Sequence, residues 1–258
     1  CAGDEPFNRK VLQQLVTSFP ETFTFLERDL LEEGFLAALL QEHSFDVVCH
    51  LAAYAGVRDS IEDPLSYVRM NVTATTLLLD LLAKETTCRR FVYASSSSVY
   101  GNSTKEVFEE SDPMVPCSPY AASKAACEMM AQTYHHLYDM QCVGLRFFTV
   151  YGPRCRRDMA PFKFIDQIYR GQPIQQFGDG SSQRDYTFVS DIVDGIVRVI
   201  DAQHLTGHEI FNLGHGEPVL LSEFIQVIEE ELGRTATIQV LPMQPGDVVR
   251  TSAGIQKA

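Results

Sequence analysis

A tyrosine and a lysine four residues apart are the side chains best suited to proton transfer. Tyr120 and Lys124 lie in Ser118-Pro-Tyr120-Ala-Ala-Ser-Lys124, at the start of a predicted helix. Residues i and i+4 share a helix face, so phenol and ammonium project side by side. A phenol with a pKa of about 10 is a poor base at neutral pH, but a neighbouring cation favours the phenolate. The pair is therefore a candidate general base with its supporting cation. This spacing is also common, and a solvated helix face is the alternative explanation.

Four consecutive hydroxyls end the predicted strand Arg90–Ser95. They are the serines from Ser95 to Ser98. Ligands bind at the carboxyl ends of parallel strands, and a hydroxyl there can hydrogen-bond a substrate alcohol and share its proton with Tyr120. Taken alone, the run is also typical of a serine-rich loop.

The elements that must position these residues alternate between short apolar runs and longer helical patterns. The predicted strands are Thr22–Leu26, Asp46–Ala52, Arg90–Ser95 and Val143–Val150, and the predicted helices are Glu32–Gln41, Pro64–Lys84 and Pro119–Tyr138. This alternation predicts an α/β fold with a doubly wound parallel sheet over residues 1–152.

Residues 153–258 have a different pattern, in which helices mix with shorter strands and more loop. The predicted helices are Ala160–Tyr169, Asp191–Ala202 and Leu221–Leu232, and the predicted strands are Ile174–Phe177, Glu209–Leu213 and Thr237–Leu241. We expect a smaller, mixed substrate-binding lobe that is interleaved with the sheet.

One expected motif is absent from the sequence. A dinucleotide-binding sheet opens with a strand, a glycine-rich turn and a helix, and the N–H groups of the turn bind the pyrophosphate. Here Gly3 is the only early glycine. The interpretation is a Rossmann-like fragment that lacks its N-terminal βαβ piece and its C-terminal tail.

Composition excludes several classes of protein. The 258 residues include 21 Lys and Arg against 34 Asp and Glu, a net charge of −13, which disfavours nucleic acid as a partner. Apolar residues make up 45%, as in ordinary globular proteins. The seven cysteines form no Cys-x-x-Cys pair, which favours reduced thiols and no metal site. No apolar run approaches the roughly 20 residues that span a membrane. We expect a cytoplasmic protein.

Several segments, in order, resemble the extended short-chain dehydrogenase/reductase family, in its branch of NAD-dependent nucleotide-sugar epimerases and dehydratases. They are Arg28-Asp29-Leu30, His50-Leu-Ala-Ala53, Asn71-Val, the serine run, Tyr120 to Lys124, Leu145-Arg-Phe-Phe148-Thr149-Val-Tyr-Gly-Pro153, Arg184-Asp-Tyr-Thr-Phe-Val-Ser-Asp191 and Pro245-Gly-Asp247-Val. The resemblance covers nearly the whole chain.

The resemblance implies NAD as cofactor and a role for each matching residue. Tyr120 becomes the catalytic base, Lys124 holds the nicotinamide ribose and lowers the pKa of Tyr120, and Ser96 is the assisting hydroxyl. The other residues implied to contact NAD or to brace its site are Asp29 and Leu30 beside the adenine, Leu51, Ala52 and Ala53 along the middle, Asn71 behind the strand, and Phe148 at the nicotinamide.

Two local features indicate the reaction. Relatives that eliminate water carry an Asp-Glu pair after the catalytic hydroxyl, and decarboxylating relatives carry a Glu there, whereas this chain has Ser97 and Ser98. Reversible oxidation at one carbon is therefore favoured. The run from Thr149 to Ala160 is similar to the loop of UDP-glucuronate 4-epimerases, which implies that Arg156 binds a sugar carboxylate with the hydroxyls of Ser97, Ser98 and Thr149. For Arg154 and Arg157 a solvated surface loop is the alternative.

The nucleotide end matches the family as well. Phe177 is implied to stack on uracil, Arg184 to pair with the diphosphate and Asp247 to accept from a ribose hydroxyl. Gln244 stands where some galactose-type epimerases have Arg. We expect Arg58 to be structural or peripheral.

The implied reaction is 4-epimerisation of UDP-glucuronate to UDP-galacturonate. Bound NAD+ takes hydride from C4 of the sugar while Tyr120 takes the O4 proton through Ser96, and the 4-keto sugar then turns and receives hydride on its other face. Two alternatives stay open: a 4-epimerase of neutral or N-acetylated UDP-hexoses, and a non-catalytic nucleotide-sugar-binding relative. The predicted helices 64–84 and 119–138 carry apolar faces compatible with a homodimer at Leu77, Leu81, Met129 and Met130.

Overall fold

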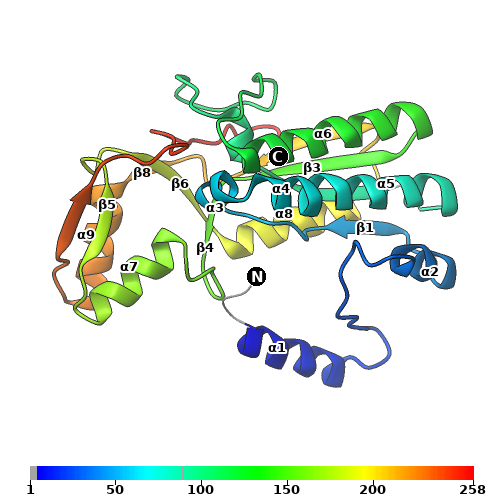
Figure 1. Ribbon diagram of the computed structural model, residues 1–258, viewed down its shortest axis with the longest axis horizontal. Coiled ribbons are helices and arrows are strands. Elements are labelled where there is room, and N and C mark those ends of the chain that lie inside the picture. The colour runs from blue at the N-terminus through cyan, green and yellow to red at the C-terminus, as the bar shows by residue number, and fades with distance from the viewer. Residues whose placement is uncertain (1–4, 89) are drawn as a thin grey trace.

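The computed structural model describes residues 5–88 and 90–258 (Figure 1). The helices are α1 (Glu5–Ser18), α2 (Phe35–Glu42), α3 (Val57–Glu62), α4 (Pro64–Tyr67), α5 (Ala74–Glu85), α6 (Pro119–Tyr138), α7 (Ala160–Tyr169), α8 (Val189–Asp201) and α9 (Leu221–Leu232). A π-helical turn, η1 (Val68–Thr73), joins α4 to α5, and a 3₁₀ turn, η2 (Ser97–Tyr100), follows β2. The strands are β1 (Val47–His50), β2 (Arg90–Ser96), β3 (Gln141–Phe147), β4 (Thr149–Tyr151), β5 (Ile174–Phe177), β6 (Gln183–Phe188), β7 (His208–Leu213), β8 (Pro218–Leu220) and β9 (Ile238–Leu241).

The main sheet has the order β1-β2-β3-β7, and all its pairs are parallel. Alternate residues of β2 face opposite sides of the sheet. Phe91 and Tyr93 pack in one cluster with α2, α5 and α6, and Val92 packs in a second cluster that includes Ile192 and Val199 of α8. Helices therefore cover both faces, and the predicted doubly wound α/β fold is confirmed.

The later part of the chain adds two small sheets. Strands β4, β6 and β8 form one of them and β5 pairs with β9 in the other. Helices α7 and α9 pack together through a cluster that includes Phe164, Ile168, Ile225 and Ile228. Strand β7 returns to the main sheet beside β3, so the later part of the chain is interleaved with the first.

Two predicted elements near the start of the chain need correction. Thr22–Leu26 is not a strand: it pairs with no strand among the described residues. A β-rich run without a neighbour to share its hydrogen bonds stays irregular, and Phe25 and Leu26 are exposed. The helix predicted from Glu32 begins instead at Phe35, because Gly34 before it has a left-handed φ of 73°.

Other predicted elements are interrupted. The helix expected over 64–84 contains η1, whose Asn71 side chain is turned into the core of the protein. The strand expected over 143–150 is two strands, because β4 pairs with β6 in a different sheet. The sequence did not predict α1, α3, β6 or β8 as elements.

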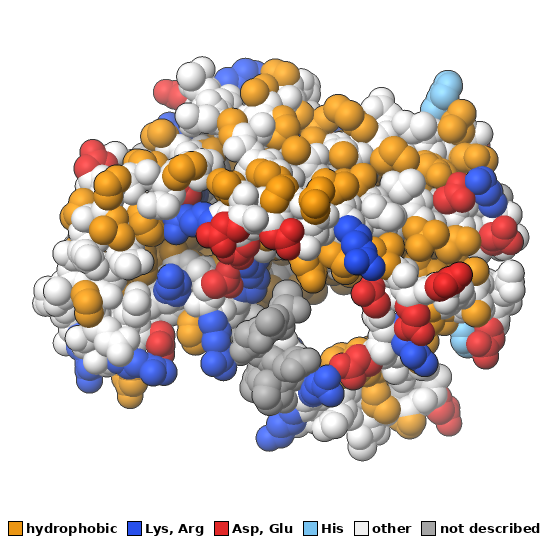
Figure 2. All heavy atoms as spheres, viewed as in Figure 1, with side chains coloured by type: hydrophobic (Ala, Val, Ile, Leu, Met, Phe, Trp, Pro, Cys, Tyr) orange, Lys and Arg blue, Asp and Glu red, His pale blue; other side chains and the backbone are white. Residues whose placement is uncertain are grey.

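The surface reflects the acidic composition. Figure 2 shows Asp and Glu side chains gathered over the region of α3 and α4, with Lys and Arg beside them. Asp59, Glu62 and Asp63 are exposed there. Over the described residues, none of the helices has the length and apolar character needed to cross a membrane.

Candidate active site

Ser96, Tyr120 and Lys124 come from two elements that meet at one edge of the sheet. Ser96 is the last residue of β2. Ser118 caps the N-terminus of α6 by accepting a hydrogen bond from Ala121 N at 3.1 Å, and Pro119 occupies the first turn. Serine at the cap followed by proline is a strong helix start, so it fixes Tyr120 in the first turn of α6. The Ser96 hydroxyl hydrogen-bonds the Tyr120 phenol.

The Lys124 ammonium is buried and aimed at the end of β2. The residue is 5% exposed, and its Nζ donates to the carbonyl oxygen of Ala94 at 2.8 Å. Burial lowers the pKa of Lys124 below its ordinary value. An ammonium has three donors, and Ala94 O is its one hydrogen-bond acceptor among the described residues. Lys124 therefore keeps donor capacity for hydroxyl groups of a ligand.

Two opposing influences act on the Tyr120 phenol. Burial raises its pKa, while the hydrogen bond with Ser96 and the positive charge of Arg156 lower it. The sequence prediction gave the lowering effect to Lys124. In the structure the positive charge of Arg156 also lowers this pKa, and the Lys124 ammonium donates to the Ala94 carbonyl. The net effect of these influences is a Tyr120 pKa above its ordinary value.

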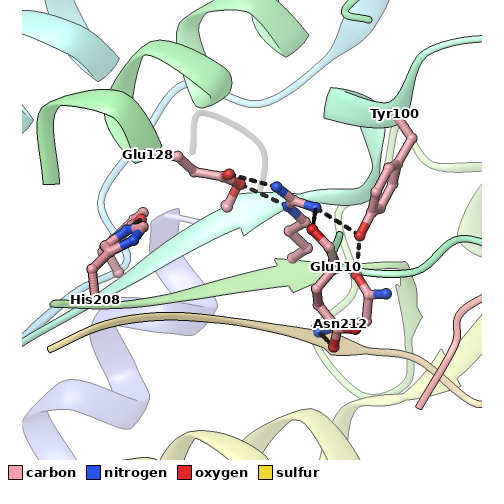
Figure 3. A network of polar contacts seen from close by, with 8 residues as sticks. Tyr100, Glu110, Glu128, His208 and Asn212 are labelled. Carbon is pink, nitrogen blue, oxygen red and sulfur yellow. Dashed lines mark hydrogen bonds and ion pairs between the residues drawn. The ribbon is translucent and has the colours of Figure 1, made fainter. Parts of the chain in front are cut away.

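A buried polar network supports the strand ends beneath these residues (Figure 3). Arg146 of β3 donates to both carboxylate oxygens of Glu128 on α6, at 3.0 and 2.8 Å, and both side chains are 4% exposed. Ser95 of β2 donates to the same carboxylate. Arg146 also donates to the Tyr100 hydroxyl at 2.8 Å, which donates to Asn212 of β7 at 2.6 Å. The network fixes β2, β3, β7 and α6 relative to one another.

Sequence reasoning missed this network. Arg146 lies inside the Leu145–Pro153 motif, but its partners Glu128 and Tyr100 are 18 and 46 positions away. A charged residue at a central position of a buried strand was the signal available, because such a charge requires a partner.

A cavity of about 200 Å³ opens beside Ser96 and is lined by Ser97 and Ser98. Other predicted substrate residues line the same cavity, namely Thr149, Arg184 and Asp247. Gly101 also lines it, with a φ of 61°. A Cβ atom there would lie 1.8 Å from the carbonyl oxygen of Val115, so this wall admits only glycine without a backbone shift.

Arg184 is a cation without a carboxylate hydrogen-bond partner among the described residues. Its Nη1 donates to the carbonyl oxygens of Gln183 at 2.8 Å and Val249 at 3.4 Å. Burial lowers the pKa of Arg184, which means that the site disfavours the charge until an anion approaches. A diphosphate suits such a guanidinium.

Arg58 was expected to be structural or peripheral, and it makes two contacts with predicted nucleotide-binding residues. Its guanidinium lies 4.2 Å from the ring centroid of Phe177 and donates to the Asp247 carboxylate at 2.9 Å. It reaches from α3 to two residues predicted to hold the nucleotide. The pairing joins residues 189 positions apart, so the sequence offered no local signal for it.

Arg156 lies close to Tyr120 and Tyr67, whose pKa values its charge lowers. It forms a two-pronged ion pair with Asp158, in which Nε donates to Oδ1 at 3.0 Å and Nη2 to Oδ2. The predicted carboxylate-binding residue therefore stands at the site, but its guanidinium already contacts a carboxylate of the same chain.

Two sets of predicted cofactor residues lie at the carboxyl end of β1. Leu51, Ala52 and Ala53 follow β1 and are exposed or half-buried. The Asn71 side chain clamps the backbone of Tyr54, accepting from its N at 2.7 Å and donating to its O at 3.0 Å. It thereby holds this segment at the carboxyl end of β1.

The remaining predicted cofactor residues lie elsewhere. Phe148 is buried against Tyr100 and Phe108 rather than in the cavity wall. Asp29 and Leu30 lie in the irregular segment between α1 and α2, where Asp29 accepts from Leu31 N at 2.9 Å and Leu30 packs on the core.

Comparison with known protein families identifies the relatives of this chain. The sequence profile of the NAD dependent epimerase/dehydratase family matches residues 3–214. The chain belongs to the NAD-dependent epimerase/dehydratase family. The predicted family is thus confirmed, and with it an enzyme that uses NAD to isomerise nucleotide sugars.

Individual relatives of this NAD-dependent epimerase agree over most of the chain. A UDP-glucuronate 4-epimerase of Thermodesulfobacterium geofontis is 40% identical over 239 residues, which cover 92% of this chain and 73% of the relative. The crystal structure of a UDP-glucuronic acid 4-epimerase from Bacillus cereus with UDP-glucuronic acid and NAD has a TM-score of 0.88 at 34% identity, covering 96% of this chain and 79% of that one. A UDP-N-acetylglucosamine 4-epimerase of Methanobrevibacter ruminantium has a TM-score of 0.84 at 29% identity, covering 92% and 76%.

The residues at the strand ends suit NAD. Lys124 offers unused N–H donors next to Tyr120, and a ribose presents hydroxyl oxygens that accept them. The segment clamped by Asn71 presents the apolar side chain of Leu51, which is 48% exposed. An exposed leucine at the carboxyl end of a parallel strand fits a ligand that lies across the strand tips.

Proposed function

We propose that this epimerase interconverts UDP-glucuronate and UDP-galacturonate by inverting C4 of the sugar. The observation that carries the substrate assignment is the Arg156 guanidinium, close enough to Tyr120 to lower the pKa of its phenol. A sugar whose C4 hydroxyl meets Tyr120 brings its C5 substituent close by, and a carboxylate at that substituent is the natural partner of a guanidinium.

Bound NAD supplies the acceptor and donor of hydride. Ser96 and Tyr120 take the proton of the sugar O4 in one direction and return it in the other. Lys124 holds hydroxyl groups of the cofactor ribose through its unused donors. The absence of a carboxylic acid at Ser97 and Ser98 removes the usual proton donor for elimination, so oxidation and re-reduction at C4 remain.

The substrate is held along the cavity by groups from several elements. We assign the sugar to Ser97, Ser98 and Thr149, the diphosphate to Arg184, and the nucleoside to Phe177 and Asp247. The contacts of Arg58 with Phe177 and Asp247 support a role for a second cation beside the nucleotide in this assignment.

We further assign residues 1–152 to NAD binding and 153–258 to the nucleotide sugar. In this assignment Asp29 and Leu30 lie beside the adenine, Leu51 to Ala53 lie along the middle of the cofactor, and Phe148 contacts the nicotinamide from the edge of its buried aromatic cluster.

A neutral UDP-hexose is the second candidate substrate, and one observation favours it. Asp158 already satisfies the charge of Arg156, so a neutral sugar can bind without leaving that cation unpaired. The alternative of a non-catalytic binding protein makes a separate forecast, since it binds UDP sugars but produces no epimer.

The experiment is a substrate panel. The NAD-loaded protein is incubated separately with UDP-glucuronate, UDP-glucose and UDP-N-acetylglucosamine, and the C4 epimers are separated by anion-exchange chromatography. We expect UDP-galacturonate from the first, with the highest kcat/KM. Faster turnover of a neutral sugar would reassign the substrate, and no epimer from any sugar despite measurable UDP-sugar binding would support the non-catalytic alternative.

We also propose a homodimer that pairs α5 and α6 of one protomer with those of its partner. Met129 is 56% exposed and Leu137 61% exposed, whereas Leu77, Leu81 and Met130 already pack on the core. Sedimentation velocity should give a dimer mass, and Met129→Glu with Leu137→Glu should give a monomer. A monomeric wild-type protein at micromolar concentration would refute this pairing.

A further inference from the structure

We infer that Asp158 is an internal competitor for the carboxylate of the sugar, and that it sets how strongly the site prefers a charged sugar to a neutral one. The inference rests on the proposed function, in which Arg156 binds that carboxylate. It adds a specificity-determining residue that does not itself contact the substrate.

The first step is the geometry of the pair. The Nε and Nη2 atoms of Arg156 donate to the two oxygens of one carboxylate. This is the two-pronged geometry in which a guanidinium binds a free carboxylate. Met159 N donates to Arg156 O at 3.2 Å, so residues 156 to 159 form a tight turn that holds Asp158 against Arg156.

The second step is the place of Arg156 in the wall of the site. Gly56 has a φ of 130°, and a Cβ atom on it would lie 3.5 Å from Arg156 Nη2 and 3.2 Å from the Tyr67 hydroxyl. The Tyr67 ring meets the Tyr120 ring edge to face at 6.1 Å. Arg156 Nη2 therefore lies beside Gly56 and the Tyr67 hydroxyl, in the part of the wall where Tyr67 meets Tyr120.

The third step is the difference in exposure between the partners. The Asp158 side chain is 58% exposed, against 30% for Arg156. Solvent can replace the contacts of Asp158 when it turns away, whereas Arg156 stays in the wall. A sugar carboxylate can thus take the place of Asp158 on the same edge of the guanidinium. The free energy lost in this exchange is the coupling energy of the Arg156–Asp158 ion pair, which is modest for an exposed pair.

The consequence concerns selectivity. Binding of a hexuronate requires Asp158 to leave Arg156, whereas binding of a neutral hexose does not. Asp158 therefore weakens the binding of the charged sugar and does not affect the binding of the neutral sugar. From the usual coupling of exposed pairs, at most about 1 kcal/mol, the dissociation constant of the charged sugar rises by about two- to five-fold.

The competing explanation is simple repulsion between Asp158 and the anionic ligand. Asp59 provides a control for it. A Cβ atom on Gly56 would lie 2.9 Å from the Asp59 carboxylate and 3.5 Å from Arg156 Nη2, and the charge of Asp59 raises the pKa of Tyr67. Its carboxylate has no hydrogen bond to Arg156 among the described contacts. Removing its charge changes the local potential without freeing the guanidinium.

The test compares Asp158→Asn with two controls in the NAD-loaded protein, each in a Tyr120→Phe background that stops turnover. The controls are Asp59→Asn, for local charge, and Asp194→Asn, which removes an aspartate with 60% side-chain exposure from a helical ion pair with Arg198. Isothermal titration calorimetry with UDP-glucuronate, UDP-glucose and UDP gives the dissociation constants. Asp158→Ser serves if the asparagine variant does not fold.

We expect Asp158→Asn to lower the dissociation constant of UDP-glucuronate about two- to five-fold and to leave those of UDP-glucose and UDP unchanged. Both control variants should leave all three dissociation constants unchanged. Weaker or unchanged UDP-glucuronate binding would overturn the inference, because Asp158 would then position Arg156 or have no influence. Equal tightening of all three ligands, or equal tightening by Asp59→Asn, would overturn it in favour of repulsion.

A further variant separates this inference from the proposed function. Arg156→Ala should weaken UDP-glucuronate far more than UDP-glucose if Arg156 binds the carboxylate. Equal losses would reject that assignment and the inference together. A selective loss with Arg156→Ala, combined with no gain from Asp158→Asn, would reject the role of Asp158 alone.

Discussion

Removing one member of the Arg146–Glu128 ion pair should destabilise the protein more than removing both. Glu128→Met leaves the Arg146 guanidinium buried, with only the Tyr100 hydroxyl and the Glu110 carbonyl as hydrogen-bond acceptors among the described residues. Both charged side chains are 4% exposed, so water cannot compensate. The expected loss in the free energy of unfolding is about 3–5 kcal/mol.

The double change to methionine removes the unpaired charge. The Ser95 hydroxyl loses its carboxylate acceptor, and a buried hydroxyl without a partner costs about 1–3 kcal/mol. Tyr100 keeps its bond to Asn212. We therefore expect the double variant to lose about 1–3 kcal/mol, less than either single variant.

Urea denaturation followed by far-ultraviolet circular dichroism measures these free energies. The matched control is the exposed Arg170–Asp166 pair at 2.9 Å, where Asp166→Ala should cost less than about 1 kcal/mol. If Glu128→Met costs no more than Asp166→Ala, or if the double variant loses as much as the two single variants added together, the network does not depend on a desolvated ion pair.

Three further predictions concern the site and its surroundings. Arg156→Ala should raise the activation free energy derived from kcat/KM by about 2 kcal/mol more for UDP-glucuronate than for UDP-glucose. This value lies between the energies of an exposed and a buried ion pair. Equal losses for both sugars in steady-state assays would contradict the prediction. Arg58→Ala should weaken binding of UDP about three- to ten-fold, since a cation–π contact and an ion pair are lost; calorimetry with unchanged affinity would place Arg58 outside the nucleotide site. His50 is buried, and burial and then the charge of Lys124 lower its pKa from 6.5 to about 4. As the pH falls, His50 therefore takes up a proton in the unfolded chain before it does so in the folded protein, and stability present above pH 6.5 is lost as the pH falls towards 4. His50→Asn should reduce the dependence of the free energy of unfolding on pH in this range. An unchanged dependence in the variant would assign the loss to other groups.

The positions of Ser96, Tyr120 and Lys124 could be predicted because their signals are local. Ser118 and Pro119 begin a helix wherever they precede a helical pattern, and this fixes Tyr120 and Lys124 one turn apart. The apolar run before Ser96 predicts a buried parallel strand whose carboxyl end carries the hydroxyls.

The features that sequence missed depend on partners far apart in the chain. Thr22–Leu26 has the composition of a strand, but strand formation is decided by a neighbour, and none is present among the described residues. The contact between Arg58 and Phe177 and the burial of Phe148 among aromatic rings follow from the packing of distant segments. The Arg156–Asp158 pair is local, yet its orientation follows from the turn and from Gly56.

The central claim is that Tyr120, with Ser96, moves the O4 proton of a UDP-hexuronate. Its most direct test is single-turnover epimerisation of UDP-glucuronate by Tyr120→Phe beside the wild-type protein, with UDP affinity measured on the same samples. We predict that the rate falls by about 100- to 10,000-fold while the dissociation constant of UDP is unchanged. Epimerisation at the wild-type rate would contradict the claim.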